Sequence, residues 1–329
     1  MSPLLVILSA LVPVFGAILT GFVVRRVGWL TESADKTLIA LTVRLLMPCL
    51  IVRAVTTGDW FDSPRDLLLP PVIGAGLSVM GFIVCAIFTT LLGRRVGLHT
   101  PAERGTFILC AGLFNYGYTP IPLVRELFPS DTATLATLLI HNVGVDTAMW
   151  TIGLLLLAGR LQPRWWAGLL NPVVLAIAVA VTLKLGVPAL LGEALTVRAV
   201  SATRPLAALL SLLADAAIPL SLLLTGATIA DVWRQADFRR GLPATAAACV
   251  LRLGVLPVLF LLVAALPLGL PLGRVVLVQA AMPAAIFPIV LARHYGGDQG
   301  IAVRVVIATQ LLSIVTSPLW LWIGGVAGR

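Results

Sequence analysis

The chain has 329 residues, of which 59% are hydrophobic and only 11% are charged, and its mean hydropathy is +1.05. A soluble domain of this length would carry about twice that share of charged residues. Apolar runs long enough to cross a lipid bilayer recur along the sequence, which indicates a polytopic membrane protein. The formal charge of +9 does not predict a nucleic-acid partner, because no basic run is longer than a pair.

The apolar runs are continuous rather than alternating, which favours helices over a β-barrel. The sequence therefore predicts an all-α protein with ten transmembrane helices. In chain order, these are expected at residues 3–24, 36–56, 67–92, 104–127, 132–158, 168–187, 205–230, 242–266, 273–293 and 299–325.

Arginine and lysine gather in the odd-numbered loops between these helices, whereas the second loop is acidic, with Asp59, Asp62 and Asp66. The positive-inside rule then places both termini outside the cytoplasmic membrane. Five helices in each half would insert the two halves with opposite orientation, as an inverted repeat requires. We expect the first repeat at 1–159 and the second at 163–329.

Two apolar segments are interrupted by prolines at corresponding places in the two halves. The first interruption is Asn115–Pro122 and contains Pro120 and Pro122. The second is Met282–Pro288, which includes Pro283 and ends on Pro288. Paired interruptions are a sequence indicator of the central site of a secondary transporter, because broken helices leave backbone groups free near the midplane. A simple kink in each helix is the alternative.

Polar side chains flank both interruptions. Asn115 and Tyr116 can donate hydrogen bonds to a carboxylate, and Gln279 is the analogous residue before the second break. Asn115 could equally cap the end of a broken helix, and both roles are compatible. We expect these residues in a substrate-binding site.

Charges at mid-depth in a membrane are costly and are candidates for function. Arg44, Asp146 and Asp215 are the candidates at mid-depth. Four other cations lie close enough to helix ends to reach water, namely Arg53, Lys184, Arg252 and Arg304. Arg44 and Asp215 each precede a proline by four residues, so we predict that they face each other as a pair. The alternative is that Arg44 binds a substrate carboxylate.

Asn142 and Asp146 stand four residues apart and should share one face of the fifth helix. One hypothesis makes Asp146 a carboxylate that couples transport to protons. The alternative is a structural aspartate that is hydrogen-bonded between helices.

Several motifs along the chain together resemble the auxin efflux carrier family, which contains plant PIN carriers and compact bacterial organic-acid permeases. The matching segments are Pro13–Gly16, Arg25–Leu30, Leu46–Pro48, Asn115–Val124, Leu170–Pro172, Ile218–Ala227, Gln279–Ala285 and Leu291–Gly296. The resemblance implies two inverted five-helix repeats whose fourth and ninth helices cross at their breaks. It also implies transport of a small organic anion, such as a dicarboxylate or an auxin-like acid, and a homodimer in a bacterial cytoplasmic membrane.

Other classes of protein remain as alternatives. A sodium-coupled bile-acid-type symporter shares the broken-helix plan, and a cation/proton antiporter has related architecture. A membrane receptor or sensor without transport is a rival of another kind. The common hydrolase, metalloprotease and phosphate-loop motifs are missing from the sequence, so an enzyme is not expected. The four cysteines share no spacing motif, and we expect neither a metal site nor a cofactor.

Overall fold

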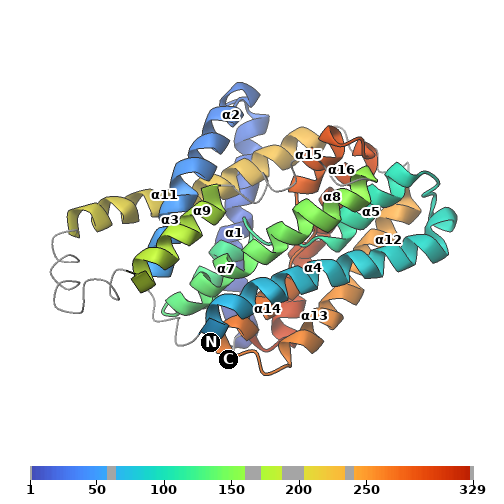
Figure 1. The fold of residues 1–329 in the computed structure, drawn as a ribbon. Coiled ribbons are helices and arrows are strands. Elements are labelled where there is room, and N and C mark those ends of the chain that lie inside the picture. Colours follow the sequence, from blue (N-terminus) through green and yellow to red (C-terminus); the bar gives the residue numbers. More distant parts are fainter. Residues whose placement is uncertain (1, 58–63, 160–171, 187–203, 234–240, 327–329) are drawn as a thin grey trace.

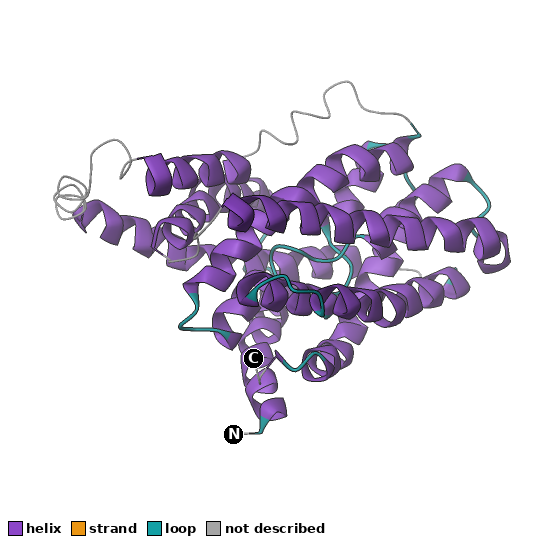
Figure 2. Ribbon diagram, turned by 60° about the horizontal axis from the view of Figure 1, so that its bottom comes forward, coloured by secondary structure: helices purple, strands orange, loops and turns teal. Residues whose placement is uncertain are grey.

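The computed structural model describes residues 2–57, 64–159, 172–186, 204–233 and 241–326 of the chain. Every regular element in these ranges is helical, as Figures 1 and 2 show. Among the described residues, seven helices are long and apolar enough to cross a membrane. The prediction of an all-α membrane protein is therefore confirmed at this level.

Each of the seven long helices falls on a predicted segment, and several contain a π-helical turn (labelled η), in which the hydrogen bonds span one residue more than in an α-helix. Gly93–Val96 is instead a short 3₁₀ extension of α4. In chain order, the seven are α1 (Pro3–Arg26); α2, η1 and α3 (Glu32–Leu41, Thr42–Leu46, Met47–Thr57); α4 and η2 (Pro64–Leu92, Gly93–Val96); α7, η3 and α8 (Thr132–Ala148, Met149–Gly153, Leu154–Ala158); α11 (Arg204–Trp233); α12, η6 and α13 (Leu242–Val250, Leu251–Val255, Leu256–Ala264); and α16 (Gln299–Ile323).

The remaining predicted segments are shorter or broken. The sixth contains α9 and η5 (Pro172–Val181, Thr182–Gly186), and its first residues, 168–171, lie outside the described ranges. The fourth divides into α5 (Pro101–Gly112) and α6 (Pro120–Leu127). The ninth divides into α14 (Leu270–Ala280) and α15 (Phe287–His294).

Both predicted helices are broken rather than kinked, so the kink interpretation is wrong, and a proline stands at the start of each new helix. Pro120 is the first residue of α6, and Pro288 is the second residue of α15. Proline is favoured at these positions because its missing N–H would have no partner there in any helix. Pro122 lies one turn into α6, and Pro283 lies in the extended segment between α14 and α15.

The helices pack in two groups. In the first, α1 packs along α11, and α3 contacts both α9 and α11. In the second, α4 packs along α7 and α5, α14 contacts α7 and α13, and α16 contacts α12 and α5. Figure 1 shows α3, α9 and α11 on one side of the molecule, with α4, α5 and α12 on the other. We call these groups the first and the second bundle, and the second carries both broken helices.

Glycines allow the closest helix pairs to touch backbone to backbone. A Cβ atom at Gly226 of α11 would lie 1.9 Å from the carbonyl oxygen of Ile18 on α1. A Cβ atom at Gly144 of α7 would lie 1.7 Å from the carbonyl oxygen of Pro71 on α4. Such small-residue contacts are the usual means of close helix packing in membranes, where lipid removes most of the hydrophobic driving force.

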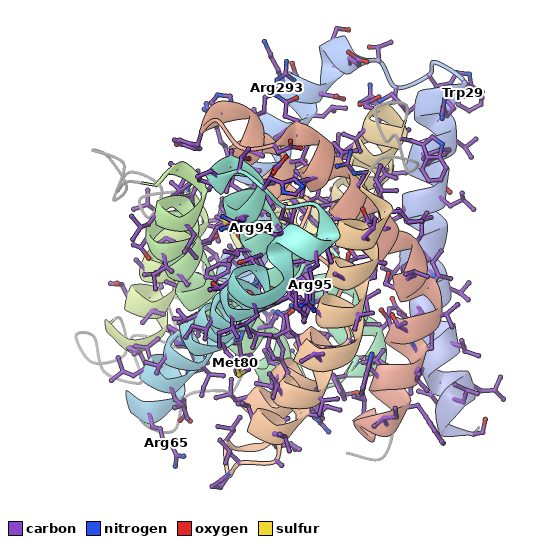
Figure 3. All side chains as sticks on the ribbon, turned by 90° about the vertical axis from the view of Figure 1, so that its right-hand side faces the viewer. Trp29, Arg65, Met80, Arg94, Arg95 and Arg293 are labelled. Carbon is purple, nitrogen blue, oxygen red and sulfur yellow. The ribbon has the colours of Figure 1, made fainter. Side chains whose placement is uncertain are left out.

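The first residues of α1 and the last residues of α16 lie on the same side of the molecule (Figure 1). In Figure 3, Trp29 and Arg293 lie at the opposite end from Arg65. An even number of membrane crossings would bring the termini together in this way.

Candidate functional site

The two broken helices cross at the centre of the second bundle, and their unwound segments pair there. Phe114 and Ala284 face each other as an isolated antiparallel bridge. The N–H of Asn115 donates to the carbonyl of Pro283 at 2.8 Å, and the N–H of Ala285 donates to the carbonyl of Leu113 at 3.0 Å. Figure 2 shows loop segments crossing the middle of the molecule among helices. Each break therefore satisfies backbone groups of the other, as a membrane interior requires.

Side chains of α16 satisfy several of the remaining backbone groups on the second break. Gln310 donates to the carbonyl of Ala284 at 3.2 Å, and Ser317 donates to the carbonyl of Ala281 at 2.7 Å. The Thr309 hydroxyl accepts from the N–H of Ala284 at 3.3 Å. These buried polar residues hold the crossing in one geometry, because each would be costly to leave unpaired.

Tyr116 connects the predicted polar residues to one another. Its hydroxyl donates to Asp146 at 2.6 Å, and its carbonyl accepts from Asn142 at 2.8 Å and from Gln279 at 3.4 Å. Asn142 and Asp146 therefore act from one face of α7, as the sequence predicts. Three residues predicted from two separate arguments therefore meet around Tyr116.

The Asn115 side chain spans the first break. Its Nδ2 donates to the hydroxyl of Thr119, the residue before α6, at 3.0 Å. Asn115 thus braces the break through a bond between side chains rather than by capping a helix end, and it also lines the adjoining cavity. Gln279 is fully buried, and its side-chain oxygen has no hydrogen-bond partner among the described residues.

A cavity of about 730 Å³ opens between the first bundle and the crossing. Val43, Met47 and Ile51 line it from the first bundle. From the second bundle its lining is largely apolar and aromatic, and Asp146 is the sole acidic or basic residue among the described lining residues. These second-bundle residues include Asn115, Tyr116, Tyr118, Ile121, Asn142, Asp146, Met149, Trp150, Ile286, Phe287 and Tyr295.

The predicted pairing of Arg44 with Asp215 is wrong in this structure. Asp215 pairs with Arg53 at 2.8 Å and approaches Arg125 at 3.6 Å. Arg44 is exposed on the π-helical turn η1, joins none of the ion pairs of the described residues and does not line the cavity. The packing of α3 on α11 brings Arg53, rather than Arg44, to the depth of Asp215. Equal spacing before a proline therefore does not place two residues at the same depth.

The Arg53–Asp215–Arg125 group lines a second cavity of about 750 Å³. Arg53 and Asp215 belong to α3 and α11 of the first bundle, whereas Arg125 belongs to α6 of the second. The carboxylate of Asp215 therefore links the two bundles. The acidic Asp131 also lines this cavity, where the Arg274 side chain donates to its carboxylate at 2.5 Å.

Arg252 corrects another expectation. The sequence suggests that it can reach water from a helix end, yet it is 0% exposed. It lies on η6, ten residues after the start of α12 and twelve before the end of α13, or about 15–18 Å along the axis from either end. The predicted bounds of 242–266 already put Arg252 ten residues from the start of the helix, which is too far for its side chain to reach water, so the expectation disagreed with the predicted helix itself.

The protein family described as "Membrane transport protein" matches residues 6–164 and 161–321. The chain belongs to this family. The resemblance to auxin efflux carriers is thereby confirmed.

Two relatives in the membrane transport protein family carry transporter names. A protein of Methanothermobacter thermautotrophicus described as an uncharacterized transporter is 26% identical over 324 residues, with 92% of this chain and 93% of the relative covered. An uncharacterized transporter of Schizosaccharomyces pombe is 27% identical over 129 residues, which cover 39% of this chain and 26% of that protein. Membership in this family indicates a membrane transporter.

Proposed function

We propose that the protein is a secondary transporter that moves a small organic anion across the membrane by alternating access. The observation that carries the proposal is the cavity of about 730 Å³ at the boundary of the two bundles, against the crossing of the broken helices. A substrate there would contact both bundles at once, so movement of one bundle against the other would expose it to one side and then the other.

The lining of the cavity supports an amphipathic acid. Tyr116, Tyr118, Trp150, Phe287 and Tyr295 offer aromatic surface to an apolar body. Asparagine amides and tyrosine hydroxyls offer donors to one carboxylate. The positive ends of the dipoles of α6 and α15 add a favourable field for an anion. No arginine or lysine is among the described lining residues, so a dicarboxylate would lack a partner for its second charge. We therefore favour an auxin-like monocarboxylate over a dicarboxylate.

Asp146 supports coupling to protons. Its carboxylate lines the cavity and is 8% exposed. Two carboxylates in one site with few cations repel each other, and a proton on Asp146 would relieve that repulsion when substrate binds. The Tyr116 hydroxyl, which donates to the Asp146 carboxylate in the empty site, would then donate to the substrate carboxylate instead.

The proposal includes the finer architecture. We propose ten transmembrane helices in two inverted repeats, 1–159 and 163–329, which cross at the breaks of the fourth and ninth helices. Both termini would lie outside a bacterial cytoplasmic membrane, because the basic loops favour the inside. The resemblance to the family supports a homodimer.

Uptake by proteoliposomes tests the proposal. Radiolabelled indole acids, monocarboxylates and dicarboxylates would be offered to the purified protein, with and without an imposed pH gradient. We expect saturable uptake of an aromatic monocarboxylate that rises with an inward proton gradient. Asp146→Asn should abolish the effect of the gradient, whereas Glu32→Gln, which removes an exposed carboxylate far from the cavity, should preserve it.

Each other outcome has its own meaning. Saturable uptake of the same acid without any effect of the gradient would remove the coupling role of Asp146 and leave a uniporter. Uptake that requires sodium would favour a bile-acid-type symporter. Specific binding of an acid without transport would favour a receptor or sensor.

A further inference from the structure

Arg252 is a buried cation whose neighbours all belong to the crossing or pack against it. Its Nη1 donates to the carbonyl of Gly112 at 3.4 Å. Its guanidinium carbon lies 5.7 Å from the ring centre of Phe114 and 5.1 Å from that of Phe260. These two rings stand edge to face with centres 5.3 Å apart. Phe114 is itself one of the two bridging residues of the crossing.

Arg252 therefore meets the carbonyl end of a half-helix. Gly112 is the last residue of α5, so its carbonyl has no partner within that helix. The C-terminal end of a helix carries a partial negative charge, and its electrostatic effect is strongest where water is excluded. A cation at this point stabilises the broken end, and the aromatic faces of Phe114 and Phe260 hold the guanidinium against it.

The charge of Arg252 is not taken up by an acid. None of the ion pairs formed by the described residues includes Arg252. Its Nε and Nη2 atoms are buried without hydrogen-bond partners in the described part of the chain. A guanidinium stays protonated in proteins. Arg252 therefore supplies a buried positive charge at this position without a full set of hydrogen bonds.

The other half-helix end is treated differently. The carbonyls that follow α14 accept from neutral side chains, with Ser317 bonded to Ala281 and Gln310 bonded to Ala284. Only the α5 end has a cation among the described contacts. The carbonyl ends of broken helices attract cations, and in many carriers a coupling ion fills that place.

We propose that Arg252 is a built-in cation that occupies the carbonyl end of α5 permanently and replaces a bound metal ion there. The inference rests on the proposed transport function, for which it specifies the ion requirement: the cycle runs without sodium or potassium at this end. Arg252 is a positioning residue, because it acts on the substrate site through Gly112 and Phe114 and does not line the cavity.

Chemical rescue tests this proposal. Arg252→Ala removes the cation and leaves a space that a free guanidinium ion fits. Arg252→Lys keeps the charge, and Arg95→Ala removes an exposed arginine as the matched control. Thermal melting in detergent and uptake into proteoliposomes would be measured for each variant in choline, sodium or potassium chloride, with or without millimolar guanidinium chloride.

We expect wild-type uptake to be the same in all three salts. Arg252→Ala should lose about tenfold in uptake, recover several-fold with guanidinium and melt at a higher temperature in its presence. Arg252→Lys should retain more activity than Arg252→Ala, and the wild type and Arg95→Ala should not respond to guanidinium.

Three results would overturn the proposal: saturable stimulation of the wild type by sodium, full activity of Arg252→Ala without guanidinium, or no response of Arg252→Ala to guanidinium in melting or uptake. The melting experiment needs no transported substrate. If wild-type protein transports nothing while guanidinium still stabilises Arg252→Ala selectively, the proposed function fails and the cation site stands.

Discussion

Gly144→Ala should separate α7 from α4 and disturb the site through packing alone. The added Cβ would lie 1.7 Å from the carbonyl oxygen of Pro71 and 2.9 Å from the N–H nitrogen of Ala75, whereas ordinary contact begins at 3.4 Å. Both obstacles are backbone, so the helices must part by about 1.7 Å. Overpacking of this kind costs about 3 kcal/mol, the upper end of the usual range, which in a chain of this size lowers Tm by roughly 4 °C.

The same displacement should impair transport, because Asn142 and Asp146 stand on either side of Gly144 and both bond Tyr116. Gly76→Ala on α4 is the matched control, since a Cβ there meets nothing within 4 Å. The assay is thermal melting of both variants in detergent, followed by uptake. If Gly144→Ala melts and transports like Gly76→Ala, the close contact of α4 and α7 does not hold the site in place.

Three further predictions concern single polar groups. Tyr116→Phe removes the hydroxyl that donates to Asp146 at 2.6 Å, and it should weaken the response of uptake to a pH gradient while Tyr295→Phe preserves it. Arg125→Gln removes the contact between the bundles at Asp215. Because exposed ion pairs contribute at most about 1 kcal/mol, the ratio of inward-facing to outward-facing molecules should change by no more than about fivefold. Cysteine accessibility measures this ratio. Burial acts to raise the pKa of Asp131, but hydrogen bonds from Thr134 and Arg274 and the charge of Arg274 outweigh it and leave that pKa below its usual value. The ionised Asp131 carboxylate therefore stabilises the fold at pH values above its unfolded pKa of about 3.9, and this contribution is lost as the pH falls through its lower pKa in the folded state. The difference in Tm between wild type and Asp131→Asn should therefore shrink on acidification.

Much of the fold could be predicted because membrane helices follow from continuous apolarity. The long helices fall on their predicted segments, and the proline pairs marked both breaks. Proline has a direct physical consequence in lipid, where a missing N–H must be compensated, so its effect could be inferred without knowledge of neighbours. The backbone pairing of Phe114 with Ala284 follows from tertiary packing and has no sequence signal of its own.

The site was predictable where its residues stand next to the breaks. Asn115 and Tyr116, next to the first break, and Asn142 and Asp146, four residues apart on α7, line the cavity, whereas Gln279 is buried outside its lining. The depth of Arg252 and the partner of Asp215 were misjudged, because both depend on how the helices pack. Trp150 and Tyr295 line the cavity, but in the sequence they resemble ordinary aromatic residues near a membrane surface. The sequence alone therefore does not assign them to a substrate site.

Asp146 and Arg252 together suggest why a singly charged substrate suits this carrier. In the empty site, the ionised carboxylate of Asp146 and the guanidinium of Arg252 sum to zero charge around the crossing. With one proton on Asp146 and a monocarboxylate bound, the substrate and Arg252 again sum to zero. Each uncompensated charge moved across the membrane would cost about 2.3 kcal/mol per 100 mV. Under the two proposals, uptake should therefore be unchanged when a potassium diffusion potential is imposed at constant pH. A dicarboxylate carried with one proton would leave one negative charge uncompensated, so uptake that responds steeply to the potential would contradict both the monocarboxylate and the balance of charges.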